Sequence, residues 1–155
     1  MPRAVLIVGL CGCGKSHLAQ DYATQGYVCL DESFEGRRFA ADPGKNLSTD
    51  KFNELKKQLA QGRDCAFTEA MLMFEAERQE FEPCLKQLQA MKGATVEWVF
   101  FANDLAAANH NCRNDPNRKD PEGAIRNNER WTGHYEIPAG HTPRPIFRIP
   151  EKKTK

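Results

Sequence analysis

The sequence predicts one α/β domain built around a parallel sheet of about five strands. Short apolar runs rich in β-branched residues recur along the chain, and stretches with helical spacing of apolar residues separate them. Strands that are apolar on both faces are typical of a parallel sheet covered by helices on each side. A chain of 155 residues, 40% hydrophobic and 28% charged, suits a single globular domain over residues 1–155.

The first half of the chain is expected to hold two strands and two helices. Residues 4–8 (AVLIV) form the first strand, and residues 27–30 (YVCL) form the second. Between them, residues 15–22 have apolar side chains at helical spacing. A second helix is expected to start at the N-cap candidates of residues 48–50 and to end at Gly62.

The second half continues the alternation. An amphipathic stretch ends near residue 91 and contains Pro83, which predicts either a kink or a helix start just before it. A short helix is expected over about 104–111. The expected strands are 65–68, 95–102 and an edge-like 145–149.

Composition excludes several classes of protein. The net charge of +1 gives no overall signal for nucleic acid or membrane, although the end after Trp131 is mildly basic. No apolar run approaches the ~20 residues that span a bilayer, and no leader peptide is evident, so we expect a cytoplasmic protein without a membrane partner. The spacing of the cysteines (11, 13, 29, 65, 84 and 112) fits neither a zinc site nor a disulfide framework and predicts reduced thiols.

A glycine-rich loop follows the first predicted strand. Residues 9–16, GLCGCGKS, match the pattern G-x-x-x-x-G-K-[S/T], with the expected helix directly after it. In such a loop the glycines let backbone N–H groups approach phosphate oxygens. Lys15 would reach the β- and γ-phosphates, and Ser16 would bind Mg²⁺. The predicted nucleotide-binding residues are Gly9, Cys11, Gly12, Cys13, Gly14, Lys15, Ser16 and His17.

With this loop, the chain resembles small P-loop kinases of the adenylate-kinase-like group, and within them the polynucleotide-kinase-like and zeta-toxin-like members. The resemblance covers about residues 4–132. It implies a three-layer P-loop NTPase fold, ATP and Mg²⁺ as cofactors, and transfer of a phosphate to a hydroxyl acceptor. It also implies an arginine-containing lid at about residues 112–130.

Two carboxylates lie at predicted strand ends. Asp31 ends the second strand, where the resemblance implies a general base that faces the acceptor hydroxyl; a solvated loop acid or a helix cap is the alternative. Glu32 and Glu35 compete for the same role. Glu69 ends the third strand, where relatives carry an aspartate that binds Mg²⁺ through water or orients substrate; here it could instead simply begin a helix.

Arginines of the lid segment would neutralise charge on the transferred phosphate. Arg113 and Arg118 fit the family pattern best, and Arg126 and Arg130 are further candidates. The alternative is a solvated segment in which the neighbouring carboxylates of Asp115, Asp120, Glu122 and Glu129 pair with these arginines.

The sequence does not identify the acceptor of the transferred phosphate. Arg37 and Arg38, with Phe34 and Phe39 beside them, could bind a polynucleotide 5′-hydroxyl end, which we slightly prefer, or another nucleotide acceptor. A small metabolite or nucleotide sugar is the alternative. A regulatory ATP-binding module with little transfer is a third hypothesis. His134 and His141 are expected to be surface residues, and the segment after Trp131 could contribute to a base pocket.

Overall fold

The computed structural model describes residues 1–31, 49–91 and 93–153. Its centre is a sheet of four parallel strands in the order β2-β3-β1-β4. The strands are β1 (Arg3–Val8), β2 (Val28–Leu30), β3 (Cys65–Thr68) and β4 (Thr95–Phe100). The α-helices are α1 (Lys15–Thr24), α2 (Thr49–Ala60), α3 (Glu75–Ala90), α4 (Leu105–Asn114) and α5 (Pro121–Trp131). Short 3₁₀ helices span η2 (Ala70–Met73) and η3 (Thr132–His134).

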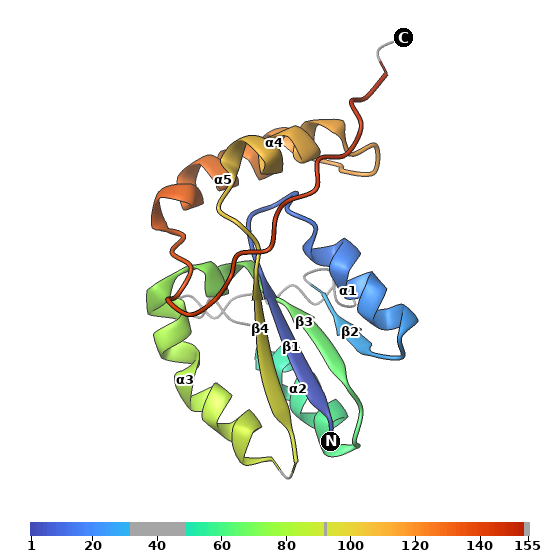
Figure 1. The fold of residues 1–155 in the computed structure, drawn as a ribbon, viewed down its shortest axis with the longest axis vertical. Helices are drawn as coiled ribbons and strands as arrows, with labels where there is room; N and C mark the ends of the chain where they lie inside the picture. Colours follow the sequence, from blue (N-terminus) through green and yellow to red (C-terminus); the bar gives the residue numbers. More distant parts are fainter. Residues whose placement is uncertain (32–48, 92, 154–155) are drawn as a thin grey trace.

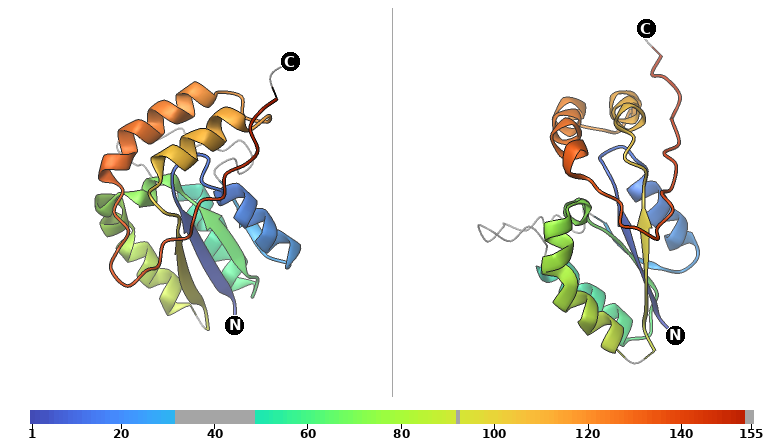
Figure 2. Two further views of the ribbon diagram at one scale, coloured as in Figure 1. Left: turned by 45° about the horizontal axis from the view of Figure 1, so that its top comes forward. Right: turned by 60° about the vertical axis from the view of Figure 1, so that its left-hand side comes forward.

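Helices cover both faces of the sheet, as the all-apolar strands predict. Figures 1 and 2 show α2 and α3 on one face and α1 on the other, with the α4–α5 pair above the carboxyl ends of the strands. β1 divides the core by alternation: Leu6 and Val8 pack with residues of α2 and α3, whereas Val5 and Ile7 pack with residues of α1. The predicted three-layer α/β architecture is therefore confirmed.

The fifth predicted strand is absent from the described residues. Where residues 145–149 were expected to extend the sheet, a single bridge joins Arg144 to Phe101 beyond the end of β4. Pro145 has no N–H to donate to a ladder, and side chains of α4 take backbone groups of Ile149 instead. The chain therefore leaves the sheet after Arg144 and crosses α4.

Pro83 neither starts nor breaks its helix. α3 begins at Glu75, well before the expected position, and continues through Pro83. Glu75 and Glu77 lie in the first turn, where negative charge favours a helix start. Arg78 holds this end in place, because its Nη1 donates to the carbonyls of Leu72 and Met73 at 2.8 Å each. The other predicted helices and strands agree with the structure to within a few residues.

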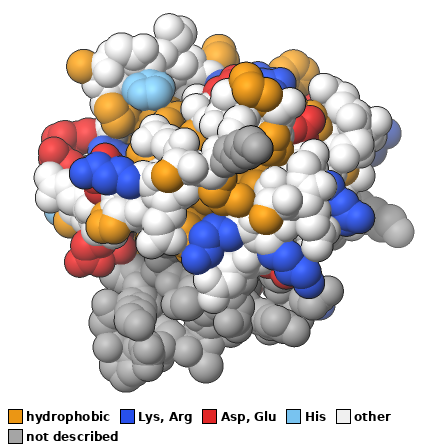
Figure 3. Space-filling view, turned by 90° about the horizontal axis from the view of Figure 1, so that it is seen from below, with side chains coloured by type: hydrophobic (Ala, Val, Ile, Leu, Met, Phe, Trp, Pro, Cys, Tyr) orange, Lys and Arg blue, Asp and Glu red, His pale blue; other side chains and the backbone are white. Residues whose placement is uncertain are grey.

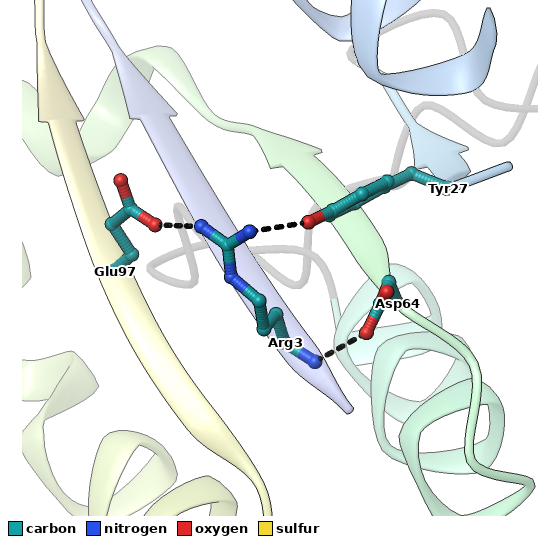
Figure 4. Close-up of polar contacts among 4 residues, drawn as sticks. All are labelled: Arg3, Tyr27, Asp64 and Glu97. Atoms are coloured by element: carbon teal, nitrogen blue, oxygen red, sulfur yellow. Dashed lines mark hydrogen bonds and ion pairs between the residues drawn. The ribbon is translucent and has the colours of Figure 1, made fainter. Parts of the chain in front are cut away.

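A polar network links the amino ends of the strands. Arg3 Nη1 donates to the Tyr27 hydroxyl at 2.8 Å, and its Nη2 is paired with Glu97 of β4 (Figure 4). The backbone N–H of Arg3 donates to the Asp64 carboxylate at 2.7 Å. Because Arg3 and Glu97 are about half exposed, we assign this network to strand alignment rather than to large stabilisation. Viewed from this end, acidic and basic side chains are interspersed with apolar ones (Figure 3).

None of the six cysteines forms a disulfide, and all six lie within the described residues. Among the residues the structure describes, no helix is long and apolar enough to cross a membrane. His134 and His141 are exposed, as expected.

Candidate functional site

The glycine loop connects β1 to α1 at the carboxyl edge of the sheet. Gly12 and Gly14 have φ of 80° and 110°, values that L side chains rarely adopt. A Cβ at Gly12 would lie 2.5 Å from the Ala108 carbonyl oxygen and 2.9 Å from Cys112 Sγ of α4. The glycine at residue 12 therefore allows both the turn and the close approach of α4 to the loop.

Lys15 lies inside this loop rather than in solvent. Its residue is 6% exposed, and Nζ donates to the carbonyls of Gly9 at 2.7 Å and Leu10 at 2.9 Å. Cys13 Sγ lies 4.0 Å from the same nitrogen. The loop thus encloses a positive charge, and α1 begins at Lys15 with no side chain capping its amino end. Backbone N–H groups, a helix amino end and an ammonium group together suit a polyphosphate.

Two buried asparagines hold the loop from outside. Asn128 of α5 is 0% exposed; its Oδ1 accepts from the Cys11 N–H, and its Nδ2 donates to the Cys11 carbonyl, each at 2.8 Å. Nδ2 also donates to Asn109 Oδ1 at 3.0 Å. Asn111 of α4 donates to the Gly12 carbonyl at 2.8 Å. The loop conformation is therefore fixed by the α4–α5 pair as well as by its own glycines.

A cavity of about 1090 Å³ opens beside the loop. One wall is the loop and the start of α1, and another is formed by residues 144–153 of the C-terminal segment with part of α4. Of the predicted site residues, the cavity is lined by Cys11, Gly12, Cys13, Gly14, Lys15, Ser16, His17 and Arg118. A second cavity of about 630 Å³ lies between α3, β4 and residues 136–141, and no predicted site residue lines it.

Arg118 is the lid arginine that the structure brings to the glycine loop. It lies in the turn between α4 and α5, and its buried Nε has no hydrogen-bond partner among the described residues. Arg113 is exposed on α4 and does not line the cavity. Within the described part of the chain, no ion pair joins either arginine to a carboxylate. Asp115 and Asp120 instead accept from backbone N–H groups, of Asn117 and Gly123.

Asp31 lies at the same edge of the sheet as the loop. It follows β2, and Thr68 at the end of β3 donates its hydroxyl to Asp31 Oδ1 at 2.6 Å. This hydrogen bond fixes the orientation of the carboxylate. Because β2, β3 and β1 are parallel neighbours, Asp31, Glu69 and the glycine loop share the carboxyl edge.

Glu69 begins a short helix, which was the alternative interpretation of this residue from the sequence. It caps η2, with Oε1 accepting from the Met71 N–H at 3.3 Å. Oε2 lies 3.8 Å from Nζ of Lys51, a buried lysine of α2 that also donates to the Thr68 carbonyl. Much of this carboxylate is thus engaged by the protein itself, which leaves the predicted substrate contact a proposal.

The remaining predicted residues do not line this cavity or lie outside the described residues. Arg37 and Arg38, like Glu32, Phe34, Glu35 and Phe39, lie outside the described residues. Gly9 does not line the cavity, and a Cβ at this position would lie 2.6 Å from Cys13 Sγ. Arg126 and Arg130 are both exposed on α5. In the described chain, no group of three metal-binding side chains occurs.

Sequence reasoning missed the asparagines; for the C-terminal wall it offered only that the segment after Trp131 could contribute to a base pocket, without naming residues. The sequence did carry a signal that the two asparagines are buried. Asn111 lies four residues after Ala107, and Asn128 lies three after Ile125, so each asparagine is on the same helix face as a buried apolar residue. Residues 144–153 carried no such signal, because irregular chain has no periodicity.

Comparisons with known proteins support the fold. No protein-family model matches this chain, and no curated protein matches it either. Among solved structures, the crystal structure of a gluconokinase from Sinorhizobium meliloti 1021 is similar, with a TM-score of 0.50 and 15% identity. The match covers 96% of this chain and 85% of that one. The chain therefore has the α/β fold of P-loop kinases, while the polynucleotide-kinase-like and zeta-toxin-like subgroups receive no support from the comparison.

Proposed function

We propose that this chain transfers the γ-phosphate of ATP to a hydroxyl group of a small metabolite. The observation that carries the proposal is the glycine loop of residues 9–16, which encloses the buried Lys15 at the carboxyl end of β1 and borders a cavity of about 1090 Å³. Phosphoryl transfer depends mainly on positioning and on neutralising charge, and this loop supplies both.

Lys15 and Arg118 are the cations in this mechanism. Lys15 would exchange its bonds to the Gly9 and Leu10 carbonyls for phosphate oxygens. Arg118 lines the same cavity, so its guanidinium would donate to a phosphate oxygen bound there. The two groups together would stabilise the charge that spreads over the transferred phosphate.

The residues also fit Mg²⁺ carried by ATP. Ser16 is exposed at the start of α1 and lines the cavity, so its hydroxyl can bind Mg²⁺ beside the nucleotide phosphates, as the Ser or Thr of this loop pattern does. When bound, the ion would neutralise the phosphates and help align them. Neither the neutralisation nor the alignment of the phosphates by this ion requires a cluster of carboxylates.

Asp31 is the proposed base. Its carboxylate, oriented by the Thr68 hydroxyl at 2.6 Å, would accept the proton of the attacking hydroxyl. Asp31 follows β2, which pairs with β3, and β3 pairs with β1, so Asp31 lies on the same edge of the sheet as the glycine loop. Glu69, held by Lys51, lies at the end of the adjacent strand and is proposed to border the acceptor.

A small acceptor is favoured over a polynucleotide end. The similar solved structure is a gluconokinase, whose name gives a sugar acid as its substrate. The net charge of the chain is only +1, which gives no overall signal for nucleic acid. We therefore place sugar acids, sugars and other small polyols first among candidate acceptors.

Transfer of label from γ-labelled ATP tests this proposal. The protein is incubated with Mg²⁺ and, separately, sugar acids, sugars, nucleosides, nucleoside monophosphates, nucleotide sugars, 5′-hydroxyl oligonucleotides and water alone. We expect label on a small hydroxylated acceptor, its loss in Lys15→Ala, and its retention in the control Lys57→Ala, which alters an exposed lysine of α2. Label on oligonucleotide ends would contradict the small acceptor, and absence of transfer to every acceptor would favour an ATP-binding module.

A further inference from the structure

The C-terminal segment is held on α4 by side chains rather than by a strand ladder. After the bridge between Arg144 and Phe101, residues 145–152 form no regular element. Figure 2 shows this segment (red) passing beside α4 toward the C-terminus. Its backbone bonds instead to three residues of α4: His110, Asn111 and Asn114.

These three side chains act in sequence along the segment. His110 Nε2 lies 2.8 Å from the Ile149 carbonyl oxygen, and Asn111 Oδ1 accepts from the Ile149 N–H at 2.9 Å. Farther along, Asn114 Oδ1 accepts from the Lys152 N–H at 2.7 Å. Ile149 thus has both of its backbone polar groups bonded to adjacent side chains of one helix.

Asn111 differs from the other two because it also reaches the glycine loop. Its Nδ2 donates both to the Gly12 carbonyl and to the Phe147 carbonyl, at 2.8 Å each. The residue is 6% exposed, and both of its side-chain polar atoms are used. One amide group therefore joins the glycine loop, α4 and the C-terminal segment.

The two parts that Asn111 joins are two walls of the same cavity. Gly12 belongs to the wall formed by the loop, and Phe147 and Ile149 belong to the wall formed by the C-terminal segment. Lys152 and Lys153 also line this second wall, so it carries positive charge beside the proposed phosphate site. A change in position of either wall must stretch a hydrogen bond of Asn111.

We propose that Asn111 is a positioning residue that sets the spacing between the glycine loop and the C-terminal wall, so that ATP binding and the docking of residues 147–152 stabilise each other. The proposal rests on the proposed function for its ligand. Its structural part, the tie between loop and segment, stands on the three hydrogen bonds of Asn111, to Gly12, Phe147 and Ile149, and on the contact of His110 with the Ile149 carbonyl beside them. Bound ATP would contact both walls, and linkage requires each effect to be reciprocal.

Amide hydrogen exchange, read from peptides that cover residues 10–16 and 146–153, tests the tie. In the unliganded protein, Asn111→Ala should raise exchange at both peptides by about 10-fold, since each lost hydrogen bond weakens local closure. In the wild type, saturating ATP·Mg²⁺ should slow exchange of the C-terminal segment. In Asn111→Ala, ATP·Mg²⁺ should no longer slow this exchange, and the Kd for ATP should rise by about 10-fold. The control Asn127→Ala, on α5 and away from the segment, should match the wild type in all of these.

A second variant separates the tie from general stability. Asn111→Asp keeps the oxygen that accepts from Ile149 but loses the donors to Gly12 and Phe147. We expect it to retain more segment protection than Asn111→Ala but to weaken ATP binding at least as much. It also serves if Asn111→Ala fails to fold.

Two results would overturn the proposal: exchange at both peptides unchanged in the Asn111 variants, or a freed segment with unchanged ATP affinity. A wild type that binds no ATP would refute the proposed function, and exchange of the unliganded protein would still decide whether Asn111 joins the two walls.

Discussion

Replacing Asn128 with alanine should destabilise the protein strongly, because this side chain is fully buried and has three short hydrogen bonds. Two join it to the Cys11 N–H and carbonyl at 2.8 Å, and the third joins it to Asn109 Oδ1 at 3.0 Å. Each bond contributes a net ~1 kcal/mol, and each buried group left without a partner adds a further penalty. We therefore expect Asn128→Ala to lower the free energy of unfolding by about 3–4 kcal/mol, a large share of the ~5–15 kcal/mol typical of a domain.

Urea denaturation followed by circular dichroism measures this loss. The midpoint should fall while the slope with denaturant stays the same, as for a change in stability alone. The matched control is Asn127→Ala, whose side chain accepts a bond from exposed Arg130 and should change stability by less than ~0.5 kcal/mol. A loss below ~1 kcal/mol in Asn128→Ala would refute the idea that α5 fixes the glycine loop through Asn128.

Three further predictions concern catalysis and pH. Asp31→Asn should lower kcat by ~10²-fold or more without changing ATP affinity, and steady-state kinetics with direct ATP titration would check both; equal loss of affinity would place Asp31 in the nucleotide site. Arg118→Ala should lower kcat/KM far more than Arg113→Ala, because Arg118 alone of the two lines the cavity; equal effects would contradict the assignment. Burial raises the pKa of the Cys65 thiol from its ordinary 9.0 to about 12, so its contribution to stability is full below pH 9 and is lost as pH rises toward 12. Urea midpoints at pH 7 and pH 10.5 should show a smaller alkaline loss in Cys65→Ala than in the wild type; equal losses would exclude the thiol as a contributor.

The regular elements of this fold were predictable because they depend on local patterns. The run from Ala4 to Val8 and the glycines that follow it indicated a buried strand and then a tight glycine turn, and both occur. The start of α3 was missed because the prediction depended on Pro83 and did not use a second local signal, the acidic residues Glu75 and Glu77 of the first turn.

The path of residues 145–149 could not be predicted, because it depends on contacts between distant parts of the chain. The run of residues 145–149 has the composition of a strand, but its backbone groups find partners in Asn111 and His110. A local sequence pattern cannot show that these backbone groups bond to side chains of a helix instead of to a neighbouring strand. In the same way, Glu69 has the spacing of a site residue, yet its ion pair with the buried Lys51 became visible only in three dimensions.

The most direct test of the account is calorimetric titration with ATP·Mg²⁺ and with adenosine, on the wild type and on Lys15→Ala. If the loop of residues 9–16 binds the phosphates, the wild type should bind ATP far more tightly than adenosine, and Lys15→Ala should lose most of that difference while its thermal unfolding remains cooperative. Equal affinity for ATP and adenosine, or ATP binding in folded Lys15→Ala as tight as in the wild type, would contradict the assignment of this loop as the phosphate site.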